Sequence, residues 1–67
     1  MKYQVSMKAA RVNVDLTFME VADALKVHYQ TYRNWENGKF AIPFKKLLEF
    51  CELVGVPYEN LKKQNTR

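Results

Sequence analysis

The 67-residue sequence contains a single cysteine and no long hydrophobic run. The lone Cys51 cannot form an internal disulfide, and without a cluster of cysteine and histidine the sequence predicts no metal site. No apolar stretch approaches the ~20 residues that cross a bilayer, and the N-terminus lacks a signal-peptide pattern. We therefore expect a cytoplasmic protein with no cofactor and no membrane partner.

The usual marks of an enzyme are also missing. The sequence has no glycine-rich loop that would cradle a phosphate and no pairing of a nucleophile with a base. Short helices of the kind predicted below would leave no concave pocket for a substrate. We therefore expect no catalytic residues and no enzymatic activity.

What the sequence does contain is apolar residues and positive charge. Apolar residues make up 48% of the chain, which is enough for a packed core and argues against disorder. A chain of this length forms one small domain with little stability in reserve. The net charge of +4 is compatible with nucleic-acid binding, but a basic surface with no partner explains it equally well.

Capping residues and apolar spacing predict an all-α protein of five short helices. Ser6 is typical of an N-cap, and Thr17 with Glu20 forms a capping box. Gly38 and Pro43 suit a helix end and a helix start, respectively. The predicted helices cover residues 7–13, 18–25, 29–36, about 43–54 and 57–63. The residues predicted to face the core from the first, second and fourth helices are Met7, Ala10, Val14, Val21, Ala22, Leu25, Phe44, Leu47, Leu48, Cys51 and Val54.

Only three residues, 26–28, join the second and third predicted helices. Helices joined so closely must cross steeply, which predicts a helix-turn-helix over about 17–36. The start of the chain, 1–5, is expected to be either a short extended segment or a flexible arm, and the tail 64–67 is expected to be flexible. The whole chain, 1–67, is predicted to form a single domain.

One stretch resembles the helix-turn-helix of the phage Cro/cI-type repressors, the XRE family: LTFMEVADALKVHYQTYRNWENGKFAIP. The resemblance covers nearly the whole chain and implies a lambda-repressor-like DNA-binding domain, a compact bundle of five short helices. The residues that match the family pattern are Leu16-Thr17, Val21-Ala22, Leu25, Val27 and Trp35-Glu36-Asn37-Gly38-Lys39.

The resemblance implies that the helix over 29–36 is the recognition helix, with Tyr32 and part of Trp35 facing the core. Its outer side chains would contact bases, since glutamine and asparagine suit adenine and arginine suits guanine. Without the resemblance, the same face would be better explained as the solvated side of a surface helix. The expected base contacts are Tyr29, Gln30, Arg33 and Asn34. The expected phosphate contacts are Thr17, Lys26, His28, Asn37 and Lys39.

The resemblance also implies an ion pair between Arg11 and Glu36. Such a pair would tie the first helix to the end of the recognition helix and so orient it. The alternative is that these are two unrelated surface charges.

Several residues depart from the family pattern. Phe18 replaces a glutamine that would bridge a phosphate and the recognition helix. Lys26 replaces a glycine, which predicts a left-handed lysine at a cost of about 1 kcal/mol. His28 replaces a serine or threonine cap and is expected to be a cap or a phosphate neighbour. Phe40 and Ile42 are expected to fold back onto the core.

Two functions are compatible with the sequence. The first is a sequence-specific transcriptional regulator of the Cro/repressor type, of phage or mobile-element origin, in the bacterial cytoplasm and nucleoid. It would bind an inverted repeat in double-stranded DNA as a homodimer. The two chains are expected to contact each other through the fifth helix and the loop before it, because no second domain is expected to supply a dimer contact. The alternative is an antirepressor or modulator that binds another repressor protein. Phe18, Phe40 and Ile42 favour that alternative if they are exposed.

Overall fold

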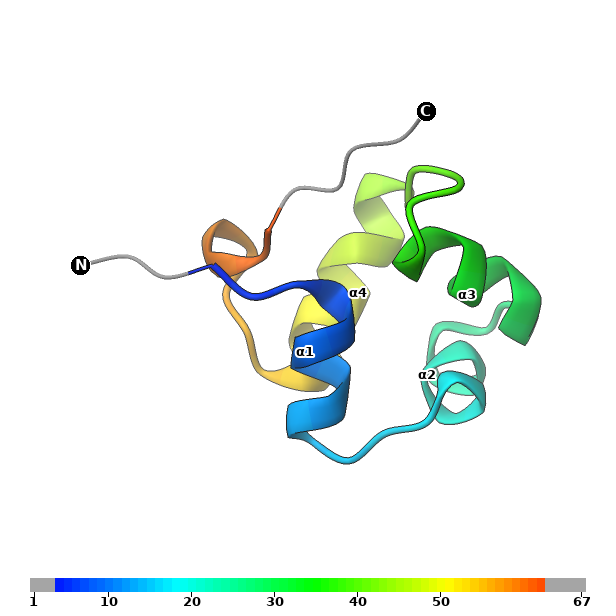
Figure 1. The fold of residues 1–67 in the computed structure, drawn as a ribbon, viewed down its shortest axis with the longest axis horizontal. Helices are drawn as coiled ribbons and strands as arrows, with labels where there is room; N and C mark the ends of the chain where they lie inside the picture. Colours follow the sequence, from blue (N-terminus) through cyan, green and yellow to red (C-terminus); the bar gives the residue numbers. More distant parts are fainter. Residues whose placement is uncertain (1–3, 63–67) are drawn as a thin grey trace.

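The computed structural model describes residues 4–62 of the chain. These residues form four α-helices and a final 3₁₀ turn, whose arrangement is drawn in Figure 1. The elements are α1 (Met7–Asn13), α2 (Phe18–Leu25), α3 (Tyr29–Glu36), α4 (Phe44–Val54) and the 3₁₀ turn η1 (Tyr58–Asn60). The prediction of an all-α fold is confirmed, since the described residues contain no strand beyond one isolated bridge.

Side-chain caps start the first two helices where the sequence predicts them. The Ser6 hydroxyl accepts a hydrogen bond from the N–H of Ala9 at 3.0 Å. The Thr17 hydroxyl accepts from the N–H of Glu20 at 3.1 Å, and the Glu20 carboxylate accepts from the N–H of Thr17 at 2.8 Å. Each bond satisfies a donor that has no partner within its helix. α4 ends at Gly55, whose φ of 74° is the left-handed conformation that glycine adopts cheaply.

A single apolar core lies between the helices, with α2 packed against both α3 and α4. Val21, Ala22 and Leu25 are buried, as predicted for α2. Tyr32 and Phe50 are completely buried, and their rings stack with centroids 6.0 Å apart. The other buried apolar residues are Met7, Ala10, Trp35, Cys51, Val54 and Leu61.

The predicted inner face of α4 was wrong in part. Phe44 and Leu48 are 60% and 43% exposed, whereas Phe50, which was not among the predicted core residues, is fully buried. The residues of α4 that face the core are spaced i, i+3, i+4 and i+7, which is the spacing of one helical stripe. That stripe consists of Leu47, Phe50, Cys51 and Val54.

The prediction for the inner face of α1 also needs a correction, at Val14. This residue is exposed because α1 ends at Asn13 and the backbone turns away, with Asp15 at a φ of 59°. The third buried position of α1 is instead Arg11, a charged residue.

The fifth helix was predicted over 57–63, but η1 is a single turn of three residues. It stops because the chain becomes extended at Leu61 and pairs with Val5 in a parallel bridge. Hydrogen bonds of 2.8 Å run from the N–H of Val5 to the oxygen of Asn60 and from the N–H of Lys62 to the oxygen of Val5. Val5 therefore belongs to an extended segment, whereas the predictions for residues 1–3 and 63–67 lie outside the described residues.

Candidate nucleic-acid interface

α2 and α3 form the helix-turn-helix, and the turn between them is held by its own backbone. Lys26 ends α2 with φ 61° and ψ 44°, the left-handed conformation expected from its place in the sequence. The N–H groups of Lys26 and Val27 donate to the carbonyl oxygens of Asp23 and Ala22 at 3.1 and 3.0 Å. These bonds fix the direction in which α3 leaves the turn.

His28 is the N-cap of α3. Its Nδ1 atom accepts a hydrogen bond from the N–H of Gln30 at 3.1 Å, so the ring replaces a serine or threonine hydroxyl. An imidazole nitrogen accepts only when it carries no proton, so this cap requires an unprotonated Nδ1. The ring is exposed and lies 5.0 Å from the ring of Tyr29, at the end of α3 where a DNA-reading helix would begin its contacts.

The outer face of α3 carries the four residues predicted to contact bases. Tyr29, Gln30 and Arg33 are exposed, and Asn34 is half-buried. The Gln30 side chain donates a hydrogen bond from Nε2 to the Oδ1 atom of Asn34 at 3.1 Å, which holds the two amides side by side. Within residues 4–62, the guanidinium of Arg33 makes no hydrogen bond and no ion pair. The structure therefore presents four polar side chains on one face.

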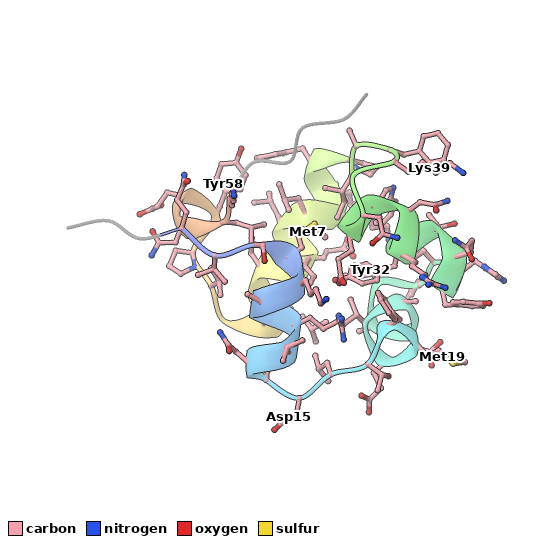
Figure 2. The ribbon with its side chains drawn as sticks, in the orientation of Figure 1. Met7, Asp15, Met19, Tyr32, Lys39 and Tyr58 are labelled. Carbon is pink, nitrogen blue, oxygen red and sulfur yellow. The ribbon has the colours of Figure 1, made fainter. Side chains whose placement is uncertain are left out.

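The inner face of α3 is anchored by a buried charge cluster around Glu36. Arg11 donates from Nε and Nη2 to the two Glu36 oxygens at 2.9 and 3.2 Å. The Tyr32 hydroxyl donates to Glu36 Oε2 at 2.6 Å, and Arg11 Nη1 donates to the carbonyl oxygen of Leu16 at 2.8 Å. Figure 2 shows Tyr32 pointing into the interior between α1 and α2. This cluster joins α1, the α1–α2 connector and α3.

Burial and hydrogen bonding change the acid–base properties of this cluster. The hydrogen bonding of Arg11 to the Glu36 carboxylate is the main factor that raises the pKa of Arg11, and it outweighs the opposing effect of burial. Burial, followed by the hydrogen bond to the Glu36 carboxylate, raises the pKa of Tyr32. Arg11 therefore stays charged and Tyr32 stays protonated across the physiological pH range.

Phe18 lies at the first residue of α2 and contacts three side chains of the same region. The Arg11 guanidinium carbon lies 4.3 Å from the centroid of the Phe18 ring, and that of Arg33 lies 5.5 Å from it. The ring centroid is also 6.2 Å from that of Tyr32. The ring is only partly buried. It contacts Arg11 of the charge cluster on one side and Arg33 of the outer face of α3 on the other.

With this geometry established, comparison with known proteins identifies the fold. A family model described as helix-turn-helix matches residues 7–61. The chain belongs to the XRE-type helix-turn-helix family. No curated protein and no solved structure matches it significantly. Family membership makes this chain a DNA-binding helix-turn-helix regulator whose partner is double-stranded DNA.

In this helix-turn-helix protein, the residues predicted to hold phosphates flank α3 along the chain. The Thr17 hydroxyl oxygen caps α2, and its hydrogen remains available for donation. Lys26 and His28 lie in the turn before α3, while Asn37 and Lys39 follow its end.

The loop after α3 departs from the prediction at one residue. Ile42 packs against the core as expected, but Phe40 is 56% exposed. The loop turns back onto α3, since the N–H groups of Lys39 and Phe40 donate to the carbonyl oxygen of Asn34 at 2.9 and 3.4 Å. Figure 2 shows Lys39 pointing away from the core, and its ammonium lies 5.8 Å from the Phe40 ring centroid.

The sequence indicated Phe18 as a departure from the family pattern and as a feature favouring a protein partner, but not its contact with Arg33. The two residues belong to different helices, and no spacing in the sequence indicates that they meet.

Two further findings bear on function. None of the helices in the described part is long and apolar enough to cross a membrane. Within residues 4–62, no group of three or more His, Cys, Asp or Glu side chains could hold a metal ion.

Proposed function

We propose that this protein is a sequence-specific transcriptional regulator of the Cro/repressor type, of phage or mobile-element origin, that reads the major groove with α3. The observation that carries the proposal is the division of α3 into two faces. Tyr32 and Trp35 are buried and Glu36 is held by Arg11, so the helix cannot rotate. The same constraint keeps its polar residues directed outward, toward a groove that admits an α-helix.

The chemistry of the outer face suits base edges. The hydrogen bond between Gln30 and Asn34 uses one amide hydrogen of Gln30 and leaves its Oε1 atom and second hydrogen free. An amide with both an acceptor and a donor free can pair with N6 and N7 of adenine. Arg33 has all its guanidinium donors available within the described residues, which suits O6 and N7 of guanine.

Positive and hydroxyl groups on both sides of α3 would hold the DNA backbone. Thr17, Lys26 and His28 would contact one strand, and Asn37 and Lys39 the other. Such contacts set the register of the helix in the groove but carry no sequence information. They would also make binding weaker as salt concentration rises.

The protein is proposed to bind its operator as a homodimer, on half-sites about 34 Å apart. Support comes from the region of η1, where the exposed aromatic rings of Phe44 and Tyr58 lie 5.4 Å apart in an edge-to-face arrangement. Exposed aromatic side chains are enriched at protein interfaces. Sedimentation of the saturated complex tests this, because one protein chain per duplex would exclude the dimer.

An antirepressor that binds another repressor protein is the second candidate. The exposed Phe40 beside the recognition helix favours it, since a protein partner could cover that ring. A partner bound at this position would compete with DNA for the same end of α3.

Selection of bound duplexes from a random pool separates the two candidates. The selection is performed with and without a second repressor protein. Enrichment of an inverted repeat by the protein alone supports the regulator. Gln30→Ala should then weaken binding to the selected site by about 1–3 kcal/mol and relax its sequence preference. The matched control is Gln4→Ala, at an exposed glutamine before α1. An unchanged site preference in Gln30→Ala would refute the assignment of α3 as the base-reading helix.

A further inference from the structure

The ring of Phe18 links the buried charge cluster to the outer face of α3. Its centroid lies 4.3 Å from the Arg11 guanidinium carbon and 5.5 Å from that of Arg33. Both distances are within the ~6 Å range over which a cation is attracted to an aromatic face. Phe18 is thus in contact with one arginine that is held inside the protein and one that is predicted to reach DNA.

The ring is itself held in place. Arg11 is fixed by Glu36 and by the carbonyl oxygen of Leu16, and the ring of Tyr32 lies 6.2 Å from that of Phe18. A fixed ring can restrain a mobile side chain, whereas a mobile ring would move with it. The restraint therefore runs from Glu36 through Arg11 to Phe18, and from Phe18 to Arg33.

The charge of Arg11 does not prevent this contact with a second arginine. Glu36 neutralises Arg11 across 2.9 Å, so Arg33 approaches a ring whose neighbouring cation is already paired. The attraction of the ring for Arg33 is opposed only by the weak field of a paired charge.

Arg33 has no other restraint among the described residues. Its guanidinium makes no hydrogen bond or ion pair within residues 4–62, so the contact with the Phe18 ring is the one interaction of that group there. A free arginine loses conformational freedom when it binds, and this loss lowers affinity. A side chain that is already oriented loses less.

We propose that Phe18 is a positioning residue for DNA recognition, whose ring holds Arg33 in the orientation in which it meets a guanine. The inference rests on the proposed function and deepens it, because it names the residue that sets up one base contact. Phe18 acts through Arg33 and does not need to touch the DNA itself. Losing it should reduce affinity for the preferred site by roughly 3- to 10-fold, the effect expected from ordering one long side chain.

The free protein provides the first test, by NMR of the Arg33 side chain. The Arg33 Hδ and Hε resonances should show a ring-current shift in the parent and in Phe18→Tyr, which keeps the ring. The shift should disappear in Phe18→Leu, which keeps only the apolar packing. Met19→Leu is the matched control, since Met19 is the next residue of α2 and its side chain is exposed. Arg33 resonances that do not respond to Phe18→Leu overturn the proposal.

The second test uses duplexes selected from a random pool by the parent protein. Phe18→Leu should bind the selected duplex about 3- to 10-fold more weakly than the parent. The affinities of Phe18→Tyr and Met19→Leu should stay within about twofold of that of the parent. In an Arg33→Ala background, Phe18→Leu should have no further effect, because the side chain it positions is gone. Urea unfolding of each variant shows that the protein being titrated is folded.

The outcomes separate this inference from the proposed function. Equal losses from Phe18→Leu with and without Arg33 would mean a structural role only, and would overturn the inference. The inference also fails if Phe18→Leu changes preference at a base that Arg33→Ala leaves unchanged, since Phe18 would then contact DNA directly. If the parent selects no sequence at all, the proposed function fails and this inference fails with it.

Discussion

Removing the carboxylate of Glu36 tests how the recognition helix is held. The Glu36 side chain is 3% exposed, and that of its partner Arg11 is 10% exposed. The carboxylate accepts two hydrogen bonds from Arg11 and one from the Tyr32 hydroxyl. Glu36→Ala would leave a buried guanidinium without its counter-charge and a buried hydroxyl without its acceptor.

The size of the effect follows from this burial. Breaking a buried ion pair costs about 3–5 kcal/mol, because the remaining charge has lost both water and its partner. An unsatisfied buried hydroxyl costs about 1–3 kcal/mol, although the two losses overlap in one cluster. A domain of this size has a total stability near the lower end of the ~5–15 kcal/mol range. We therefore expect Glu36→Ala to be largely unfolded near 37 °C.

Urea unfolding followed by the fluorescence of Trp35, the single tryptophan, measures the loss. With an m-value of about 1–1.5 kcal/mol/M, a loss of about 3 kcal/mol lowers the midpoint by about 2–3 M. The matched control is Glu49→Ala. Glu49 pairs with Lys46 at 3.5 Å across a partly exposed surface, where an ion pair contributes about 0–1 kcal/mol.

A second variant separates charge burial from packing. Replacing Arg11, Tyr32 and Glu36 together with Met, Phe and Leu removes every buried charge and hydroxyl of the cluster. This variant should recover much of the stability that Glu36→Ala loses, because no desolvated charge remains. A change below about 0.5 kcal/mol for Glu36→Ala itself would show that the two side chains are solvated and would refute the reasoning.

Three further predictions concern other parts of the site. Lys26→Gly should raise the free energy of unfolding by about 1 kcal/mol, because glycine relieves the left-handed conformation at φ 61°; a urea titration in which stability falls would contradict this. Lys39→Ala should weaken binding to all duplexes alike and reduce the salt-dependence slope by about one unit, while Lys62→Ala, beside η1, should leave the slope unchanged. Because the pKa of Tyr32 is raised in the folded state, its contribution to stability is complete below pH ~10 and is lost as pH rises above that value. Tyr32→Phe should therefore lose less stability than the parent between about pH 9 and pH 11, and equal losses would show that Tyr32 is not the group responsible.

The ends and spacing of the first three helices were predictable from the sequence because their causes are local. Thr17 and Glu20 are three residues apart and cap α2 by themselves, and the three-residue connector requires α2 and α3 to cross. Such features depend on neighbours within a few residues, so the order of the residues determines them. The left-handed conformation of Lys26 was expected only from the resemblance, because this residue stands where the family has a glycine.

The rotation of α4 and the fate of the C-terminal segment were not predictable in this way. The sequence allows two overlapping apolar stripes on α4, and only packing against α2 decides that Phe50 is buried and Phe44 is exposed. The predicted fifth helix becomes a single turn because Val5, far away in the sequence, accepts a hydrogen bond from the N–H of Lys62 and donates one to the oxygen of Asn60. A pairing partner at that distance has no local signal.

By itself, then, the amino-acid order determined the three helices of the N-terminal half, the turn at residues 26–28 and the polar face of α3. The resemblance to XRE-type proteins added the Arg11–Glu36 pair as an expectation. Only the tertiary structure decided that this pair is buried, and that Phe18 lies against both Arg11 and Arg33. The physical reason is that burial and ring contacts depend on how α1, α2 and α3 close around one another, and distances between helices are not encoded in the spacing within any one of them.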